Sequence, residues 1–290
     1  MKPSLPRIAA FQDLCSFGRA ALGSVTPTLS AMGVQVCPVP TALLSAHLGF
    51  TGCSFLDLTD YMQAHLAHWQ GASLTFDGVF TGFFASAKQI NMAINYIRTQ
   101  PQGTFIAVDP VMGDHGKAYS SIDTEAFVPE MKKLAANANL ITPNITEAAL
   151  LLGREVPAVI DESLLKEWLI ALSELGPAQA VITSVPSPYG DDDTVNTALF
   201  DRDENRFYLI SCPRINAIFP GTGDTFTSVL LGAVLQGRTL VDAAGLAVAF
   251  LSYCMVQTMA AGSPPIEGVL LEKCLPLLPT ITPTPAKEIY

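Results

Sequence analysis

Short apolar runs alternate with longer amphipathic segments along most of the chain, and polar or glycine residues end each run. Brief apolar runs are typical of buried strands, whereas apolar positions repeated every three or four residues favour helices. The runs predict strands at residues 7–11, 34–39, 76–83, 104–108, 140–141 and 180–184. The amphipathic segments predict helices at residues 19–32, 85–98, 125–136, 145–153, 162–175, 221–235 and 267–277.

Because strands and helices alternate, we expect an α/β fold with a mostly parallel central sheet and helices on both of its faces. Residues 194–200 and 206–212 are spaced as a β-hairpin. We find no internal repeat and no interior linker, so residues 1–290 are predicted to form one domain. Residues 279–290 are rich in proline and are predicted to be a mobile tail.

Residues 243–261 carry no charged side chain and are long enough to cross a bilayer. The segment has no cationic flanks, and it contains Ser252, Gln257 and Thr258. These features favour a buried helix at residues 241–259 over a membrane span.

The amino-acid composition predicts a large buried interior. Of the 290 residues, 49% are hydrophobic and only 14% are charged, which favours an extensive core and a subunit interface. The net charge of −10, with 16 lysines and arginines, argues against a surface for nucleic acid or for an anionic membrane. Any phosphate must therefore be bound by backbone groups and a metal ion.

The six cysteines show no Cys-x-x-Cys spacing, and several lie in apolar runs. Free thiols of this kind are typical of a reducing cytosol. The apolar run at residues 7–11 is too short for the core of a signal peptide. We therefore expect a cytoplasmic protein.

The sequence Gly221-Thr222-Gly223-Asp224 opens the predicted helix at residues 221–235. A Gly-x-Gly turn leaves the first backbone N–H groups of a helix free to bind an anion. Asp224 would repel a phosphate there unless it has a function of its own. It could accept the proton of a hydroxyl that attacks a phosphoryl group, or it could cap the helix. The turn by itself leaves both roles open.

Oxygen-bearing side chains also follow other predicted strands. Asp109 and Asp114 enclose a Pro and Gly loop, where they could bind Mg²⁺ or only shape the turn. Asn144 and Glu147 have the spacing of a capping box, and their oxygens could equally serve as ligands. Two hydroxyl residues end the strand at 180–184. Because parallel strands end at one edge of a sheet, we expect these groups to lie close together.

Four further segments supply candidate residues or loops. Asp13 ends the first predicted strand, at the same edge of the sheet. His47 lies in a loop, where it could contact a substrate or be a core histidine satisfied by backbone groups. Residues 113–120 are a candidate flap over a nucleotide or an ordinary surface loop. Residues 186–193 form a polar loop rich in Pro, Gly and Asp, and its three consecutive aspartates are expected to be a solvated tip.

Seven motifs occur in order along the chain, namely "QD", "AHLGF", "DGVFTGFF", "DPVMGD", "ITPNITEA", "VITS" and "GTGDTF". Together they resemble the ribokinase-like (PfkB) vitamin kinases, and specifically the pyridoxal/pyridoxamine kinases, over residues 7–262. The resemblance implies a three-layer α/β/α sandwich. It also implies ATP- and Mg²⁺-dependent phosphorylation of the 5′-hydroxymethyl group of a vitamin B6 vitamer.

The resemblance further implies a role for each candidate residue. Asp224 would be the catalytic base, and Gly221, Thr222 and Gly223 would form the anion hole for the γ-phosphoryl group. The remaining implied residues are Asp109, Asp114 and Glu147 around the metal, Thr142, Asn144, Thr183 and Ser184 for ATP, and Asp13, His47, Leu48 and Phe83 for the substrate. The resemblance does not determine whether a monovalent cation is required or which nucleotide is preferred. It implies a homodimer that binds small molecules and no nucleic acid.

The vitamin-side residues depart from the family pattern. Related kinases typically carry Ser, Thr and Tyr where this chain has Asp13, Leu48 and Phe83, although His47 and Gly49 fit. An unpaired buried polar group costs about 1–3 kcal/mol, so these changes bear on substrate identity. We hypothesise that Asp13 accepts a hydrogen bond from a protonated ring nitrogen or a cationic amine. Such a contact would favour pyridoxamine-like or aminopyrimidine substrates.

Two other functions fit the same residues. Hydroxymethylpyrimidine kinase shares the fold and the central motif, and its substrate is also an aromatic ring with a hydroxymethyl group. A non-catalytic vitamin-binding protein is the second alternative. A protein without catalysis need not keep four carboxylates near a phosphate site, which argues against it.

Overall fold

The computed structural model describes residues 5–157, 159–187, 191 and 193–290. Its strands are β1 Arg7–Cys15, β2 Gln35–Leu44, β3 Phe55–Asp57, β4 Gly78–Thr81, β5 Phe105–Val108, β6 Gly113–Asp114, β7 Lys117–Ala118, β8 Leu140–Ile141, β9 Gln179–Pro186, β10 Thr194–Asp201, β11 Arg206–Pro213 and β12 Lys287–Ile289. Its α-helices are α1 Leu22–Ala31, α2 Thr59–Gly71, α3 Ala87–Ile97, α4 Thr124–Ala135, α5 Ile145–Leu152, α6 Glu162–Glu174, α7 Thr222–Leu235, α8 Leu240–Ala260 and α9 Leu271–Cys274.

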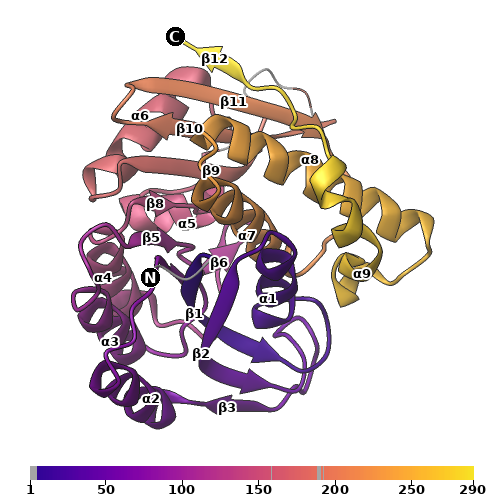
Figure 1. Cartoon of the computed structure of the whole chain (residues 1–290). Coiled ribbons are helices and arrows are strands. Elements are labelled where there is room, and N and C mark those ends of the chain that lie inside the picture. The colour runs from indigo at the N-terminus through magenta and orange to yellow at the C-terminus, as the bar shows by residue number, and fades with distance from the viewer. Residues whose placement is uncertain (1–4, 158, 188–190, 192) are drawn as a thin grey trace.

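All of these strands except β6 and β7 belong to one sheet, in the order β12-β11-β10-β9-β8-β5-β4-β1-β2-β3 (Figure 1). The neighbours from β2 to β9 pair in parallel. Antiparallel strands extend both edges. The structure thus contains the predicted mostly parallel sheet and the predicted hairpin of β10 and β11.

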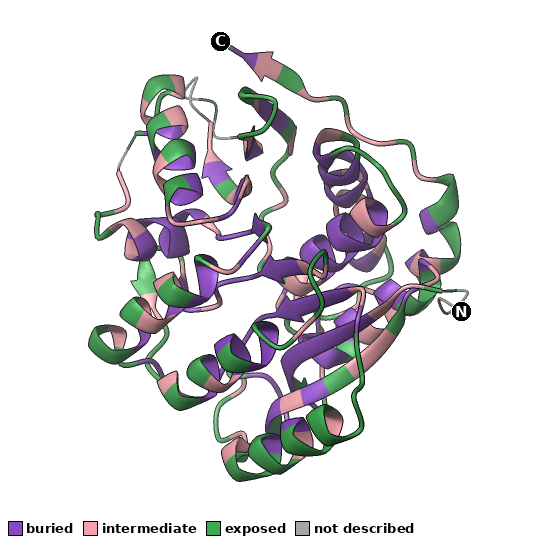
Figure 2. Cartoon of the chain, turned by 60° about the vertical axis from the view of Figure 1, so that its left-hand side comes forward, coloured by how far each residue is buried: buried purple, intermediate pink, exposed green. Residues whose placement is uncertain are grey.

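Alternate residues of each strand face opposite sides of the sheet, so the sheet carries two apolar cores. In β1, Ile8 and Ala10 belong to the core beneath α1, α7, α8 and α9, whereas Ala9 and Phe11 belong to the core beneath α2 to α6. The strands are largely buried and the outer sides of the helices are exposed (Figure 2). The protein is therefore a three-layer α/β/α sandwich, which confirms the predicted fold class.

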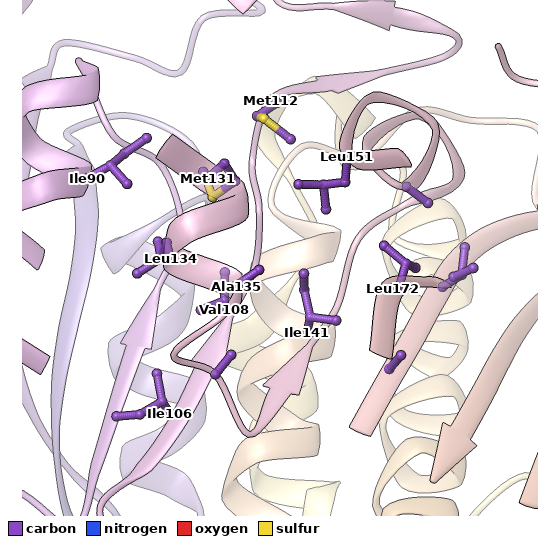
Figure 3. Close-up of a cluster of buried hydrophobic side chains, with 14 of the residues drawn as sticks. Ile90, Ile106, Val108, Met112, Met131, Leu134, Ala135, Ile141, Leu151 and Leu172 are labelled. Atoms are coloured by element: carbon purple, nitrogen blue, oxygen red, sulfur yellow. The ribbon is translucent and has the colours of Figure 1, made fainter. Parts of the chain in front are cut away.

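Figure 3 shows part of the second core, where buried residues of β5 and β8 lie among residues of α3 to α6. Val108 and Ile141 are neighbours on adjacent strands, and both are fully buried. Met112, just after β5, and Leu151 of α5 are buried in the same cluster. This packing fixes α5 against the segment that follows β5, and both carry candidate site residues.

The apolar segment predicted as a buried helix is α8, Leu240–Ala260. It is long and apolar enough to cross a membrane by length and composition, and half of its most apolar window is buried inside the protein. Its buried side packs against α7 and joins the first core. Core helices of soluble proteins show the same composition, so the structure agrees with the interpretation as a core helix.

The predicted last helix, residues 267–277, is wrong. The region holds a 3₁₀ turn at Pro265–Glu267, the four-residue α9 and a second 3₁₀ segment at Leu275–Thr280. Pro276 and Pro279 lack the N–H groups that would continue an α-helix, so the segment breaks into short pieces.

Part of the segment predicted as a mobile tail, residues 279–290, is a strand in the structure, and mobility of the segment stays a prediction. β12 pairs antiparallel with β11, with Phe207 opposite Ile289. The Ile289 side chain is 2% exposed and joins the second core. A three-residue strand shows too little periodicity to be identified from sequence, and only its tertiary pairing reveals it.

The sequence prediction also missed β3, α2 and the β6–β7 pair. α2 is mostly polar, and of its residues only Met62 and Leu66 are buried, so its apolar periodicity is weak. The predicted solvated tip at residues 186–193 includes positions 188–190 and 192, which lie outside the described residues. Asp191 and Asp193 of that segment are exposed.

The direction of strand addition reverses at β1. β2 lies on one side of β1, and β4, the next parallel strand along the chain, lies on the other. Open α/β sheets bind ligands beyond the carboxyl ends of their strands, at such a switch point. The topology therefore places a ligand site beyond the ends of β1 and β4.

Candidate active site

Two cavities meet at the N-terminus of α7. The larger, of about 920 Å³, is lined by residues of α5, α8, β9, β10 and β11. The smaller, of about 420 Å³, is lined by residues at the ends of β1, β2 and β4. Thr222 and Gly223 line both cavities, as do Thr183 and Ser184. Ligands bound in the two cavities would therefore meet at the first turn of α7.

The turn that begins α7 requires glycine at position 221. Gly221 has a φ of 80°, in the left-handed region. A Cβ there would overlap the Arg19 carbonyl oxygen and lie 2.8 Å from Ala20 Cα. The Thr225 N–H donates to the Gly221 carbonyl, whereas the three preceding N–H groups have no acceptor within the described part of the chain. These three groups are available for an anion, whose binding stays a prediction.

Asp224 does not cap α7. Its Oδ2 accepts the backbone N–H of Ala21, on a different segment, at 2.7 Å. Ala21 precedes α1 and has a φ of 50°, which is strained for a residue other than glycine. Burial raises the pKa of Asp224, and the Ala21 hydrogen bond partly opposes that shift. An oriented carboxyl with a raised pKa is suited to accept a proton from a ligand at the junction of the cavities.

Asp109 and Glu147 are buried carboxyls close to each other, 5% and 3% exposed. Burial raises the pKa of both groups well above the usual range. Repulsion from Asp224 adds to the shift at Asp109, and repulsion from Asp109 adds to the shift at Glu147. The lining of the smaller cavity contains five carboxyl groups and no lysine or arginine. A bound cation would relieve this repulsion.

The predicted metal ligands do not form a ready-made metal site. Among the residues that the structure describes, no group of three or more histidine, cysteine or carboxyl side chains could hold an ion. Mg²⁺, however, is commonly bound by one or two carboxylates together with substrate phosphates. The acidic cavity therefore fits an ion that arrives with a nucleotide. The roles of Asp109, Asp114 and Glu147 as its ligands stay predictions.

Asn144 and Glu147 form the capping box at the start of α5. Asn144 Oδ1 accepts the Glu147 N–H at 3.0 Å, and Glu147 Oε2 accepts the Asn144 N–H at 2.9 Å. Asn144 Nδ2 also donates to the Gly113 carbonyl at 2.8 Å, and Glu147 Oε1 accepts the Met112 N–H at 3.1 Å. Both side chains thus hold the loop after β5 against α5. If Asn144 contacts ATP, its side-chain amide must bind ATP in addition to these hydrogen-bond partners.

The other predicted ATP-binding residues lie where β8 and β9 end. Thr142 is buried, and its hydroxyl is hydrogen-bonded to that of Thr227 at 3.0 Å, which ties β8 to α7. Thr183 and Ser184 face both cavities, and Ser184 has a φ of 57°. Their position beside the larger cavity is consistent with a nucleotide there, and the contact with ATP stays a prediction.

Asp13 faces the smaller cavity from β1 and is 7% exposed. Its Oδ2 accepts a hydrogen bond from the Cys15 thiol at 3.1 Å. Burial raises the pKa of Asp13 to about 7, the Cys15 hydrogen bond opposes the shift, and repulsion from Asp224 adds to it. The carboxyl of Asp13 therefore changes between its neutral and charged forms near neutral pH.

His47 is the backbone-satisfied histidine considered from the sequence. Its Nδ1 accepts the Gly49 N–H at 3.1 Å, so Nε2 carries the hydrogen and donates to the Ile266 carbonyl at 2.7 Å. The ring lines the smaller cavity, where only its carbon atoms remain for a substrate. Phe83, 8% exposed, and Leu48, 46% exposed, line the same cavity. Their contact with a substrate stays a prediction.

The predicted flap, residues 113–120, contains the β6–β7 hairpin. The Gly116 N–H donates to Thr146 Oγ1 at 2.9 Å, which attaches the hairpin to the first turn of α5. Asp114 and His115 line both cavities, so the hairpin lies beside their junction. This position suits a flap, and its closure over a nucleotide stays a prediction.

The sequence analysis missed Tyr119, which follows this hairpin and lines the smaller cavity. Tyr119 is 37% exposed, and the groups packed around its hydroxyl raise its pKa by excluding part of the water, while four carboxyl groups, led by Glu147, raise it further. The hydroxyl therefore stays protonated and can donate a hydrogen bond near the acidic cluster. Tyr119 lies within the predicted flap, but nothing in the sequence placed it beside these carboxyls.

Comparisons with known proteins agree with this geometry. A family model described as phosphomethylpyrimidine kinase matches residues 11–267. A Bacteroides thetaiotaomicron protein described as a phosphomethylpyrimidine kinase, solved in a crystal form with pyridoxal, is 39% identical, with a TM-score of 0.95 over 99% of this chain and 100% of that one. Lactobacillus plantarum pyridoxal kinase is 31% identical, with a TM-score of 0.87 over 96% of this chain and 98% of that one. Arabidopsis thaliana pyridoxal kinase is 28% identical over 274 residues, which are 87% of this chain and 82% of that protein.

The family model spans most of the chain, and the solved relatives match it over nearly its whole length. The two joined cavities and the half-buried Asp224 at their junction lie where the sequence motifs predicted a phosphotransfer site. The chain therefore belongs to the phosphomethylpyrimidine kinase family and is a ribokinase-like kinase of the pyridoxal kinase type.

Proposed function

We propose that the protein transfers the γ-phosphoryl group of ATP to the 5′-hydroxymethyl group of a vitamin B6 vitamer. The observation that carries this proposal is the half-buried Asp224, held by the Ala21 N–H beside the free N–H groups at the N-terminus of α7, where the two cavities meet. The larger cavity suits the nucleotide and the smaller one suits a single aromatic ring. The pyridoxal-containing crystal form of the 39% identical relative supports the choice of vitamer.

In the proposed reaction, Asp224 takes the proton of the 5′-hydroxyl group as its oxygen attacks the γ-phosphorus. The Ala21 N–H holds the carboxyl in place, and burial keeps its pKa above the ordinary value, which strengthens it as a base. The N–H groups of Thr222, Gly223 and Asp224 then donate to the phosphoryl oxygens. Positioning and backbone electrostatics account for most of the catalysis, which suits a cavity without lysine or arginine.

Mg²⁺ would enter with ATP and would be held on the protein side by Asp109, with Asp114 and Glu147 around it. It would neutralise phosphate charge that the acidic cavity otherwise repels. Asp109 suits this role because burial and repulsion from Asp224 raise its pKa with no opposing hydrogen bond, and a cation would relieve that repulsion.

ADP release from Mg²⁺-ATP, with pyridoxal, pyridoxamine, pyridoxine and hydroxymethylpyrimidine as substrates, tests the proposed function. We expect turnover of at least one B6 vitamer. Turnover of hydroxymethylpyrimidine alone would favour the second candidate, a hydroxymethylpyrimidine kinase, which the description of the family model supports. Tight vitamer binding without any turnover would contradict both.

We propose that Asp13 sets the vitamer preference through its charge. Below pH 7 the carboxyl is largely neutral, and above pH 7 it is an anion that attracts a cationic amine. We expect the ratio of kcat/KM for pyridoxamine to that for pyridoxal to rise about tenfold from pH 6 to pH 8. In Asp13→Asn, which keeps the size of the side chain, the ratio should stay nearly flat. Equal slopes in the two proteins would contradict this role.

The same pKa shift predicts how stability depends on pH. The folded protein holds the Asp13 proton up to about pH 7, whereas the unfolded chain releases it near 3.8. Folding therefore takes up a proton between these values, and wild type should gain stability relative to Asp13→Asn as the pH falls through 7. Urea denaturation of both proteins at pH 8 and pH 5 measures the difference. A difference that grows with rising pH would contradict the assignment.

We also propose that the protein is a homodimer. Leu14, Leu43 and Leu56 lie opposite one another on β1, β2 and β3, and they are 39%, 39% and 56% exposed. An exposed apolar row across three strands at a sheet edge is suited to an interface. A second copy is the expected partner because most soluble oligomers are symmetric assemblies of one chain.

We expect Leu56→Asp to shift the protein from dimer to monomer in analytical ultracentrifugation, because the substitution places a charge in the apolar contact that the proposed interface would bury. Ile170→Asp is the matched control, since Ile170 is 41% exposed on α6, away from the leucine row. A monomeric wild-type protein, or a dimeric Leu56→Asp protein, would contradict the proposed interface.

A further inference from the structure

Gln12 is a fully buried polar residue to which the proposed reaction gives no role. Gln12 lies within β1, and its side chain lies across Gly82, the residue that follows β4. A Cβ at Gly82 would overlap all three terminal amide atoms of Gln12. The close approach of these two residues therefore depends on glycine at position 82.

The orientation of the Gln12 amide is fixed by one hydrogen bond. The Phe83 N–H donates to Gln12 Oε1 at 3.2 Å. A backbone N–H can only donate, so the atom that faces it must be the amide oxygen. The NH₂ group therefore points elsewhere, and it is buried without a hydrogen-bond acceptor in the described part of the chain. A buried donor without a partner is costly and rare.

Within the described part of the chain, the Asp109 carboxyl lacks a hydrogen-bond donor, just as the Gln12 NH₂ group lacks an acceptor. It is 5% exposed, and its pKa is raised by burial and by Asp224 with no hydrogen bond to oppose the shift. Phe11, Thr81 and Val108 are direct neighbours on β1, β4 and β5. One residue further along, the same register aligns Gln12, Gly82 and Asp109.

These three residues also share one face of the sheet. Ala10, Phe80 and Ala107, two residues earlier on each strand, all belong to the core beneath α1 and α7. Side chains two residues apart on a strand point to the same side. Adjacent strands lie about 4.8 Å apart, so the Gln12 amide above Gly82 is about one strand spacing from the Asp109 backbone. Gly82 has no side chain to separate the two groups.

We propose that the Gln12 NH₂ group donates a hydrogen bond to the Asp109 carboxylate in the nucleotide-bound enzyme and holds it toward the phosphates. The same amide binds the Phe83 N–H through its oxygen, so Gln12 connects the wall of the vitamer cavity to the phosphate side of the site. Gln12 is a positioning residue, since it acts through Asp109 and Phe83. The role of Asp109 toward the metal-bound nucleotide rests on the proposed function.

Two substitutions at position 12 separate the two contacts. Gln12→Glu keeps an oxygen for the Phe83 N–H and loses the NH₂ donor, whereas Gln12→Met is similar in length and loses both. We expect both variants to bind Mg²⁺-ADP about 10- to 100-fold more weakly in isothermal titration calorimetry, because a charge-assisted hydrogen bond is lost. The KM for the vitamer should rise in Gln12→Met and stay near the wild-type value in Gln12→Glu.

Gly82→Ala provides a test that leaves both polar groups in place, because its methyl group would occupy the volume of the Gln12 amide. We expect it to weaken Mg²⁺-ADP binding as the position 12 variants do. Thr28→Val is the matched control. Thr28 is fully buried on α1, over the same core, and its hydroxyl also has no partner among the described residues. Its substitution should leave Mg²⁺-ADP binding unchanged.

Mg²⁺-ADP affinities within twofold of wild type in both position 12 variants would overturn the proposal. So would an equal loss of affinity in Thr28→Val. The calorimetry requires no vitamer turnover, so it remains informative if the wild-type enzyme phosphorylates a different alcohol. Failure of the proposed function would appear separately, as wild-type protein that binds Mg²⁺-ADP and phosphorylates no B6 vitamer.

Discussion

Asp224→Asn should lower kcat for vitamer phosphorylation about 1,000-fold, within the range for loss of a general base. The amide keeps an oxygen that can accept the Ala21 N–H, so the local geometry should survive. It cannot take the proton of the attacking hydroxyl, because a neutral amide has almost no basicity. ADP release measured with saturating vitamer and Mg²⁺-ATP gives the change in kcat.

Nucleotide binding distinguishes this catalytic effect from damage to the site. Asp224→Asn should bind Mg²⁺-ADP at least as well as wild type, because it removes a negative charge from the acidic junction of the cavities. A variant that keeps most of its kcat would show that Asp224 is not the base. A variant that loses nucleotide binding as well as activity would show that Asp224 has a mainly structural role.

Gly221→Ala should destabilise the protein by about 3 kcal/mol or more and abolish phosphotransfer in the fraction that folds. The methyl group must adopt a φ of 80° and would also overlap the carbonyl oxygen of Arg19. To relieve this overlap, the start of α7 has to move away from the segment that precedes α1. That movement would carry Asp224 away from its partner Ala21 and would displace the N–H groups that we propose bind the phosphoryl oxygens. Urea denaturation measures the stability, and ADP release measures the activity.

Gly237→Ala is a matched control at the other end of α7. Gly237 has a φ of 87°, but a Cβ there would meet no atom within 4 Å. This substitution should therefore cost only the backbone strain, about 1 kcal/mol, and should leave activity intact. Equal losses of stability at positions 221 and 237 would show that φ alone accounts for the effect and that contact with Arg19 contributes nothing.

Much of the fold could be predicted from the sequence because buried parallel strands and their helices carry strong periodic signals. The runs that became β4, β5, β8 and β9 were placed within a few residues. Elements whose stability comes from tertiary contacts were not predicted. β12 exists through its pairing with β11 and the burial of Ile289, and α2 contributes only two buried residues.

The candidate site likewise contains residues that could be predicted from local sequence and residues whose roles depend on tertiary contacts. The glycine turn at 221–223 and Asp224 carried a local signal, because their chemistry depends on neighbours along the chain. The sequence could not decide between a cap and a base for Asp224. In the structure α7 has no side-chain capping hydrogen bond, and Asp224 accepts the Ala21 N–H instead. Asn144 and Glu147 had two possible roles, and the structure shows both making the capping-box hydrogen bonds.

By itself, the sequence determined the α/β class, because alternating strands and helices carry local periodicity. It also determined which carboxyl groups follow the carboxyl ends of the strands, because that depends only on the order of the motifs along the chain. Only the tertiary structure decided which groups meet. It buried Asp13, and this burial raises the pKa of Asp13 to about 7 against the opposing hydrogen bond from Cys15. It also occupied both nitrogens of His47 with backbone groups. It also aligned Gln12 with Asp109 across Gly82. Burial and hydrogen bonding between distant segments set the charge and orientation of a side chain, and such contacts exist only after the strands have paired.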